Sequence, residues 1–422
     1  MNSLEIRLKY GREDLYVSIP DYLLEFIAQS KKEVQATLND INKVLDGFMF
    51  QINKVKDKIL KKGLLLLLSD HTRAVPNKKI LPLILNKLHD NGFKDDNIRF
   101  LIAYGLHKKI TDKDVKDFFG IDPNEYTVLH HDATNEEELI ALGKTSFGTP
   151  VKINKELHEA GYSIGIGLIE PHFFAGYSGG YKIILPGISA KESIFSNHSY
   201  KMIDHPKSRY GILDGNPLRE DIEEAGKMSG LDAIINVVIN SKKEIAGVFA
   251  GDPKLAHRMG VKLLDSFSKV SVPKPTDIVI TTNGGYPLDR NLYQGVKGMA
   301  TAELVVKEGG VIIYAGECSD GLTHEHFKEL MVIGDKPEDV LEFIKEYEPI
   351  QDQWEAQILA RILKKAKIIV VTKNIKEKVL NEMKLLGAKT VDEALEMALE
   401  IKGQDARIGV IPNGPYVIPT IS

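Results

Sequence analysis

The chain has 422 residues, of which 43% are hydrophobic and 27% are charged, with a formal net charge of −4 at pH 7. This length exceeds what one hydrophobic core usually serves, so two domains are expected. The small negative charge gives no electrostatic reason to expect binding to nucleic acid or to an anionic membrane.

The use of cysteine and of apolar residues predicts a soluble, cytoplasmic protein. The single cysteine, Cys318, excludes an internal disulfide, a zinc ribbon and an iron–sulfur cluster, because each of these needs several thiolates. The first 14 residues carry charges where a signal peptide needs an apolar core. The longest apolar run, Leu64–Leu68, is too short to span a bilayer.

Helices and strands are predicted to alternate along the first part of the chain. Apolar positions at helical spacing predict a helix within 31–60, and further helices are expected around 77–90, 111–119 and 217–230. A hairpin is expected through 234–240 and 244–249. Apolar runs typical of buried strands occur at Gly63–Leu68, Ile98–Tyr104, Tyr126–Leu129, Tyr162–Ile169 and Thr276–Thr282.

Two prolines within Ser271–Pro275 predict a linker, because proline stops both a helix and a central strand. A second series of strands follows at 277–282, 311–315 and 367–372. The predicted fold class is therefore α/β, with a domain at 1–270 and another at 276–422. Each domain is expected to hold a mostly parallel sheet flanked by helices, with the active site in the cleft between them.

Polar clusters follow the predicted strands. They are Asp70-His71-Thr72-Arg73, Gly105-Leu106-His107, His130-His131-Asp132, Glu170-Pro171-His172 and Asn283-Gly284-Gly285-Tyr286. Ligands of open α/β sheets bind outside the carboxyl ends of the strands, so distant segments are expected to converge there. The pattern favours an enzyme. Asp70 and Arg73 suit binding of hydroxyl and carboxylate groups, and a capped helix start is an equally simple interpretation.

The stretch 170–187 is unusually rich in glycine and leads to Lys182. Gly176, Gly179 and Gly180 would permit close backbone approach to a ligand and leave amide groups free for an anion. A lysine in apolar surroundings tends to lose its proton and to become a nucleophile or covalent anchor. The alternative is a glycine turn with an exposed lysine.

The histidines fall into two groups. His107, His172 and His198 lie near turns, where they could serve as acid, base or metal ligand. Their spacing is only a weak indication of a metal site. A strand-end turn stabilised by Asp132 is the favoured interpretation of 130–132. Surface positions are expected for His89, His158, His205, His257, His324 and His326.

The predicted second domain contributes Gln294 and Lys297, three residues apart and therefore on one side of a helix. They would bind an anionic substrate, or they are an ordinary solvated pair. No GxGxxG, GxxxxGK[ST] or GxSxG motif is present. A Rossmann dinucleotide site, a P-loop and a serine-hydrolase elbow are thus unsupported.

Taken together, these motifs resemble the nickel-pincer-nucleotide-dependent lactate racemase family of 2-hydroxyacid racemases and epimerases. The resemblance runs over essentially the whole chain. Besides the clusters above, it is carried by Leu142-Gly143, Gly148-Thr149-Pro150, Gly176-Tyr177-Ser178-Gly179-Gly180-Tyr181-Lys182, Asn197-His198 and Tyr293-Gln294-Gly295-Val296-Lys297. Tyr104, and Lys108-Lys109 after His107, depart from the usual family pattern and bear on which substrate fits.

The resemblance implies a cofactor, nickel pyridinium-3,5-bisthiocarboxylic acid mononucleotide, supplied by separate maturation enzymes. It implies that His198 is the protein's nickel ligand and that Lys182 can tether the cofactor covalently. Asp70, Gly179 and Gly180 would also contact the cofactor. Substrate binding would fall to Arg73, Tyr293, Gln294 and Lys297.

The implied reaction inverts C2 of a small, lactate-like 2-hydroxyacid by reversible hydride transfer to the cofactor, with His107 and His172 as acid/base groups on the two sides of a planar 2-oxoacid. Sulfur and imidazole donors suit nickel. Two rivals stay open: a metal-independent acid/base racemase or lyase, and a non-catalytic binding protein of the same fold. A homo-oligomer is compatible with either.

Overall fold

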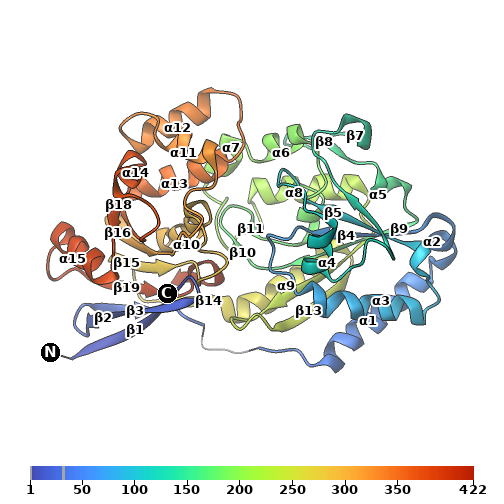
Figure 1. Cartoon of the computed structure of the whole chain (residues 1–422), viewed down its shortest axis with the longest axis horizontal. Coiled ribbons are helices and arrows are strands. Elements are labelled where there is room, and N and C mark those ends of the chain that lie inside the picture. Colours follow the sequence, from blue (N-terminus) through green and yellow to red (C-terminus); the bar gives the residue numbers. More distant parts are fainter. Residues whose placement is uncertain (1, 31–33) are drawn as a thin grey trace.

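The computed structural model describes residues 2–30 and 34–422 and contains two six-stranded sheets, one in each half of Figure 1. In the first sheet every neighbouring pair is parallel except β12 and β13, which form the predicted antiparallel hairpin. Its strands in spatial order are β13 (Ile245–Gly251), β12 (Ala233–Ile239), β9 (Tyr162–Leu168), β4 (Leu64–Ser69), β5 (Ile98–Ala103) and β6 (Thr127–His130).

Both faces of the first sheet are covered, which explains why β4 is a continuous leucine run. Leu65 and Leu67 pack in the same core as α8 (Pro217–Ser229) and α9 (Pro253–Ser268). Leu64, Leu66 and Leu68 pack in the core that contains α1 (Leu38–Asn53), α3 (Asn77–Asp90) and α4 (Asp112–Phe119). A strand buried on both faces must be apolar at every position.

The helix boundaries follow from local capping. Thr111 and Asp114 form a capping box at the start of α4. Asn216 caps α8, Pro217 occupies its first turn, and Gly230 ends it with φ of 76°. These ends agree with the helices predicted around 111–119 and 217–230.

The second sheet is entirely parallel. Its strands in spatial order are β18 (Leu386–Ala388), β17 (Ala366–Val371), β16 (Val306–Ala315), β15 (Thr276–Thr282), β19 (Ile408–Ile411) and β3 (Leu24–Ile27). The predicted α/β class, with mostly parallel sheets flanked by helices, is confirmed. The division of the chain at 270–276 stays a prediction.

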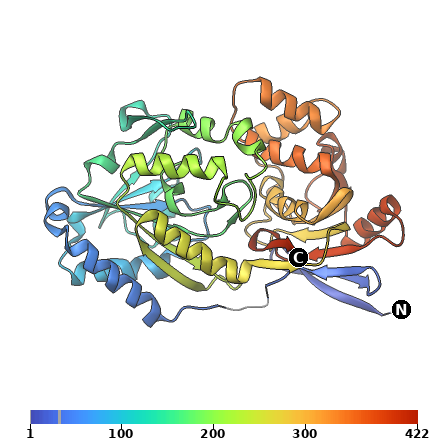
Figure 2. The same ribbon diagram turned by 180° about the vertical axis from the view of Figure 1, so that it is seen from behind.

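The N-terminal segment corrects one part of that predicted division. Residues before 28 were expected in the first domain, yet β3 pairs with β19 of the second sheet. The β1 (Ser3–Tyr10) and β2 (Glu13–Pro20) hairpin packs in the same core as β15 and β16, and Figure 2 shows it beside the C-terminus. The pairing of β3 is non-local, so a local pattern could not reveal it.

Two other predicted segments also differ. The helix predicted within 31–60 is two helices, α1 and α2 (Lys56–Lys62), and residues 31–33 lie outside the described residues. The predicted linker 271–275 begins inside a strand, since β14 (Lys269–Val272) pairs in parallel with β20 (Ile418–Ile421). Pro273 and Pro275 follow that strand, as their missing amide donors require.

The remaining elements complete the layers. The short strands are β7 (Leu139–Lys144), β8 (Pro150–Asn154), β10 (Pro171–His172) and β11 (Gly176–Tyr177). The other helices are α5 (Glu156–Glu159), α6 (Lys191–Asn197), α7 (Tyr200–Asp204), α10 (Leu292–Glu303), α11 (Glu325–Met331), α12 (Pro337–Glu346), α13 (Gln353–Lys365), α14 (Glu377–Glu382) and α15 (Val391–Lys402). Within residues 2–30 and 34–422, none of the helices has the length and apolarity that crossing a membrane requires.

A pair of glycine substitutions tests the docking of β3 on β19. A methyl group at Gly409 would overlap the buried ring of Phe26, so Gly409→Ala is expected to lower the free energy of unfolding by about 1–3 kcal/mol. Gly47 lies within α1 with nothing within 4 Å of an added methyl group, so Gly47→Ala is expected to raise it by roughly 0.5–1 kcal/mol. Denaturant unfolding measures both, and equal shifts would contradict the packing of Phe26.

Candidate active site

One cavity lies where the carboxyl ends of β4, β5 and β9 face α10 and α13. Its open volume is about 1210 Å³, which includes solvent space at its mouth. The residues to which the family resemblance gives a role in the site all line it: Asp70, Arg73, His107, His172, Gly179, Gly180, Lys182, His198, Tyr293, Gln294 and Lys297. Its lining does not include Gly176 or the clusters at 130–132 and 283–286. The structure thus brings together side chains that are up to 227 positions apart.

Asp70 and His107 form a dyad at the ends of β4 and β5. Asp70 is buried, and its Oδ2 contacts His107 Nδ1 in a short hydrogen bond. Its Oδ1 accepts from the amide of Thr72 at 3.0 Å and from the hydroxyl of Thr72 at 2.6 Å. Burial alone would raise the pKa of Asp70, but His107, Arg73 and Thr72 outweigh it and hold that pKa well below its usual range. The carboxylate therefore accepts the Nδ1 proton of His107 and leaves the Nε2 lone pair as a base.

The glycine-rich segment after β9 is buried and crowded. A methyl group at Gly179 would lie 2.7 Å from Asn236 Oδ1, and one at Gly180 would lie 2.9 Å from the ring of His257. Both glycines also have positive φ. The Gly180 amide donates to Asn236 Oδ1 at 2.7 Å, so the expectation that its N–H is free for an anion is wrong.

Lys182 follows on a short 3-10 helix (Gly180–Ile183) and is buried, so the exposed-lysine alternative is excluded. Its ammonium nitrogen lies 5.7 Å from the centre of the Phe174 ring. Burial, with smaller contributions from Arg219, Arg73 and Lys297, lowers the pKa of Lys182 well below its ordinary value. The neutral amine is the nucleophilic form of a lysine.

His172 is enclosed by aromatic rings and by the backbone of its own loop. Its ring centre lies 5.0 Å from that of Phe173 and 4.5 Å from that of Phe174. Burial, then Lys182, Arg73 and other cations, lowers the pKa of His172 well below its usual value. The amide of Ala175 donates to His172 Nδ1 at 3.3 Å. In the neutral ring the proton therefore sits on Nε2, the nitrogen left for a ligand.

His198 terminates α6 and is 5% exposed. Phe174 and Trp354 contact it edge to face, and its Nδ1 has no hydrogen-bond partner within the described chain. Burial and Lys182 lower the pKa of His198 to about 3, so the imidazole is neutral. A buried, neutral and unpartnered imidazole has the properties of a metal ligand.

Helix α10 directs Tyr293, Gln294 and Lys297 into the cavity from the second sheet. Asn291 caps this helix by accepting from the Gln294 amide at 2.9 Å. Lys297 is half-buried, and burial followed by Arg73 lowers its pKa. Arg73 is itself weakly paired, since its Nη1 lies 4.0 Å from Glu170 Oε1. Two cations without a close carboxylate partner favour an anionic ligand.

Helix α13 and its start contribute residues that the sequence analysis did not select. Tyr293 donates from its hydroxyl to Asp352 Oδ1 at 3.1 Å and accepts from Trp354 Nε1 at 3.0 Å. Glu355 lines the cavity, and its Oε1 is buried without a hydrogen-bond partner in the described ranges. Burial raises the pKa of Glu355, opposed by Lys297. Trp354, the chain's one tryptophan, was the available signal for this region.

Other histidine and strand-end predictions were partly right. Asp132 accepts from the amide and hydroxyl of Thr134, as expected for a turn it stabilises. His257 was expected at the surface but is buried, with Nε2 2.8 Å from the carbonyl of Ser178. Helix α9 carries it inward against the glycine-rich segment, a contact that its helical spacing did not distinguish from solvent exposure.

The donor set of the cavity fits a metal-bearing cofactor that brings most of its own ligands. Among residues 2–30 and 34–422, no group of three or more His, Cys, Asp and Glu side chains is placed to hold a metal ion. His198 offers an imidazole whose Nδ1 is unpartnered within the described residues, and Lys182 offers a buried amine that is close enough to lower the pKa of that histidine.

Comparisons with known proteins agree over nearly the whole chain. The lactate racemase N-terminal domain family matches residues 10–211, and the lactate racemase C-terminal domain family matches residues 272–419. A lactate racemase of Thermoanaerobacterium thermosaccharolyticum is 40% identical, over 98% of this chain and 98% of that protein. A lactate racemase of Lactiplantibacillus plantarum is 40% identical over 85% of each chain.

Solved structures give the same answer. The lactate racemase apoprotein of T. thermosaccharolyticum superposes with a TM-score of 0.91 at 39% identity, covering 99% of this chain and 100% of that one. A protein from Thermotoga maritima shares the fold, with a TM-score of 0.70 at 20% identity, over 93% of this chain and 100% of its own. On these matches, the chain belongs to the lactate racemase family of isomerases.

Proposed function

We propose that this enzyme inverts the C2 centre of a small 2-hydroxyacid such as lactate, with a nickel-pincer nucleotide bound in the cavity. The observation that carries the proposal is the arrangement of two buried or paired imidazoles, His107 and His172, opposite the carboxylate-binding groups of α10. Family membership supports the same reaction.

The carboxylate of the substrate would bind Arg73, Lys297 and Gln294. Arg73 has a long ion pair and lowers the pKa of the half-buried Lys297, so an anion between the two cations would relieve their mutual repulsion. Tyr293 is held by Asp352 and Trp354, which orients its ring toward the bound acid. The substrate carboxylate would neutralise Arg73 and Lys297, and these residues would hold the acid in one orientation.

The substrate hydroxyl is the group that needs a base. Asp70 holds His107 with Nε2 free, so His107 would take the hydroxyl proton. His172 would donate a hydrogen bond from its Nε2–H to the oxygen of the planar 2-oxoacid. To exchange a proton with that oxygen it would pass through its imidazolium form, because a neutral ring that lost the Nε2 proton would be an imidazolate. An imidazole on each side of that plane serves both enantiomers.

A C2 hydrogen is too weakly acidic for efficient removal by an imidazole alone, and the pincer nucleotide, when bound, supplies an acceptor and donor for hydride. His198 would be the nickel ligand from the protein, Lys182 would anchor the nucleotide, and Asp70, Gly179 and Gly180 would contact it. Asp70, Lys182 and His198 are buried, which limits the contact of these groups with water, whereas the His107 side chain is half-exposed.

The enzyme would depend on maturation enzymes that supply the cofactor and would be located in the cytoplasm. Its chain would divide into two functional parts near 270–276. Residues of the first part would handle protons and cofactor, and those of 276–422 would complete the substrate site. A homo-oligomer is compatible with this scheme.

The function is tested with protein purified from cells that make the cofactor. We expect L- and D-lactate to interconvert, and His107→Ala and His172→Ala each to lower kcat by about 100-fold or more, because each removes a proton-transfer group. His89→Ala removes an exposed histidine paired with Asp95 and is the control. Full turnover in both active-site variants would exclude the assignment. Unchanged turnover after cofactor removal would favour the metal-independent rival, and binding without turnover of any 2-hydroxyacid would favour the binding protein.

Lys182 should react as a neutral amine at a pH where other lysines are protonated. An amine is nucleophilic above its pKa, and burial lowers the pKa of Lys182, so its reactivity should persist toward lower pH. Acylation of the apoprotein by a small reagent across a pH series, followed by peptide mass spectrometry, measures this. The exposed Lys254 serves as the internal reference. Identical pH profiles for the two lysines would contradict the buried amine.

His198→Ala should release the metal while the fold is kept, because it removes the ligand that the protein supplies. Metal content per chain and the intact mass of the purified protein measure the loss. The exposed His205 provides the matched control His205→Ala, for which no change is expected. Equal metal content in both variants would remove His198 from the site.

A further inference from the structure

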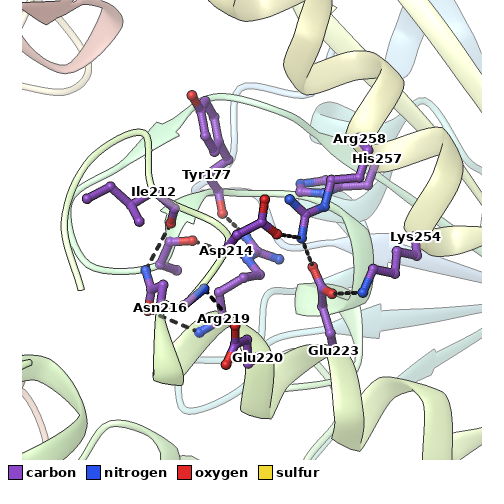
Figure 3. A network of polar contacts seen from close by, with 12 residues as sticks. Tyr177, Ile212, Asp214, Asn216, Arg219, Glu220, Glu223, Lys254, His257 and Arg258 are labelled. Atoms are coloured by element: carbon purple, nitrogen blue, oxygen red, sulfur yellow. Dashed lines mark hydrogen bonds and ion pairs between the residues drawn. The ribbon is translucent and has the colours of Figure 1, made fainter. Parts of the chain in front are cut away.

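Arg219 on α8 is a fully buried arginine directed at the glycine-rich segment (Figure 3). Its Nε donates to the carbonyl of Ala175 at 3.1 Å and its Nη1 to that of Gly179 at 3.4 Å. Its Nη2 donates to the carbonyl of Tyr177 in a short bond. Burial lowers the pKa of Arg219 to about 10, so the side chain is still a cation at neutral pH.

Burying a cation raises the free energy of the folded state unless its N–H groups are all hydrogen-bonded. Here the acceptors are backbone carbonyls of a segment that forms no long helix and whose strand, β11, has two residues, so those carbonyls also need donors. Neighbouring side chains complete the set. Asn216 Nδ2 donates to the carbonyl of Phe174 at 2.9 Å, and His257 Nε2 contacts that of Ser178 at 2.8 Å. Side chains of α8 and α9 thus fix the conformation of residues 174–179.

Ala175 connects these hydrogen bonds to His172. The carbonyl of Ala175 accepts from Arg219, and the amide of Ala175 donates to His172 Nδ1 at 3.3 Å. That amide shares its peptide unit with the carbonyl of Phe174, which accepts from Asn216. A peptide unit whose oxygen accepts a hydrogen bond is a stronger donor at its nitrogen.

We propose that Arg219 is a positioning residue for His172. By holding the carbonyls of Ala175, Tyr177 and Gly179, it keeps the Ala175 amide on Nδ1 of His172 and so places the ring proton on Nε2. The consequence for turnover rests on the proposed function, whereas the position of the proton does not. His107 and His172 then present opposite hydrogen-bonding character to a ligand, one an acceptor and the other a donor.

The same cation acts on Lys182. After burial, Arg219 is the largest contributor to the lowered pKa of that lysine. Arg219 thus acts on both residues of the glycine-rich segment that the proposed reaction uses, His172 and Lys182.

Nitrogen-15 NMR of histidine-labelled apoprotein tests the proposal without the cofactor. The His172 signals are assigned by their loss in His172→Gln. In the wild type we expect an unprotonated Nδ1 and a protonated Nε2. In Arg219→Gln the loop loses most of its donors, and we expect the ring to sample both tautomers. Arg219→Lys keeps the charge but has one nitrogen for three carbonyls, and an intermediate spectrum is expected.

Arg258→Gln is the matched control. Arg258 lies beside Arg219 and forms ion pairs with Asp214 at 2.9 Å and Glu223 at 3.3 Å (Figure 3). The substitution Arg258→Gln therefore removes one positive charge near Arg219 and leaves the hydrogen bonds to residues 174–179 in place. The control should keep the wild-type His172 signals. A proton on Nδ1 in the wild type, or the same His172 spectrum in Arg219→Gln as in the wild type, would overturn the proposal. Equal changes in both glutamine variants would also overturn it.

Turnover provides the second readout. In cofactor-loaded enzyme, Arg219→Gln should lower kcat by about 100-fold with little change in KM, because a displaced imidazole costs rate rather than binding. Arg219→Lys should recover part of that loss. If Arg219→Gln fails to fold by circular dichroism, the wild-type and Arg219→Lys spectra decide. A wild type with the expected tautomer but no racemisation would refute the proposed function and leave the role of Arg219 standing.

Discussion

The site depends on hydrogen bonds that other elements make to the backbone of residues 174–180. This segment pairs only some of its amides and carbonyls internally, so other elements supply further partners. Arg219 and Asn216 of α8, His257 of α9 and Asn236 of β12 do so. The glycines follow from the same crowding, because side chains at 179 and 180 would overlap those partners. A rigid segment at this point is what allows an imidazole and an amine to be held in a dry cavity.

Charge balance in the cavity explains why its lysines are perturbed. Besides burial, Arg73 lowers the pKa of both Lys182 and Lys297, and Lys297 lowers that of Lys182, while Asp70 is occupied by His107 and Thr72. Glu355 is buried with a raised pKa and cannot offset them fully. An anionic ligand would restore the balance, and both a carboxylate substrate and a phosphorylated cofactor have this character.

Much of this architecture could be predicted from residues alone. Leucine and isoleucine runs identified the central strands because a two-sided parallel sheet leaves them no polar position. The clusters at 70–73 and 105–107 and His172 converge on the cavity because the carboxyl ends of parallel strands meet at one edge, whereas the clusters at 130–132 and 283–286 do not line it. The pairing of β3 with β19 was missed because Leu24 and Ile408 are joined by 384 positions of chain, and no local signal encodes such a contact.

The missed site residues share a physical reason. Arg219, His257 and Glu355 are polar residues on helices, where a solvated position is the usual outcome. Arg219 and His257 point inward because backbone carbonyls that face them lack a hydrogen-bond donor, and those carbonyls belong to another segment of the chain. Sequence spacing reports the apolar side of a helix, but the need of a distant carbonyl for a donor appears only once the chain has folded.

His107 and His172 have different hydrogen-bond partners, although the two enantiomers that they would serve are mirror images. A racemase substrate and its product have equal free energies, so kcat/KM must be the same in both directions whatever the residues do. His107 is held by a carboxylate and His172 by an amide, which are opposite environments. That difference can therefore appear only as compensating changes in kcat and KM between enantiomers. An asymmetric pair of imidazoles is compatible with a symmetric overall equilibrium, because the protein controls how tightly each enantiomer is held and not the balance between them.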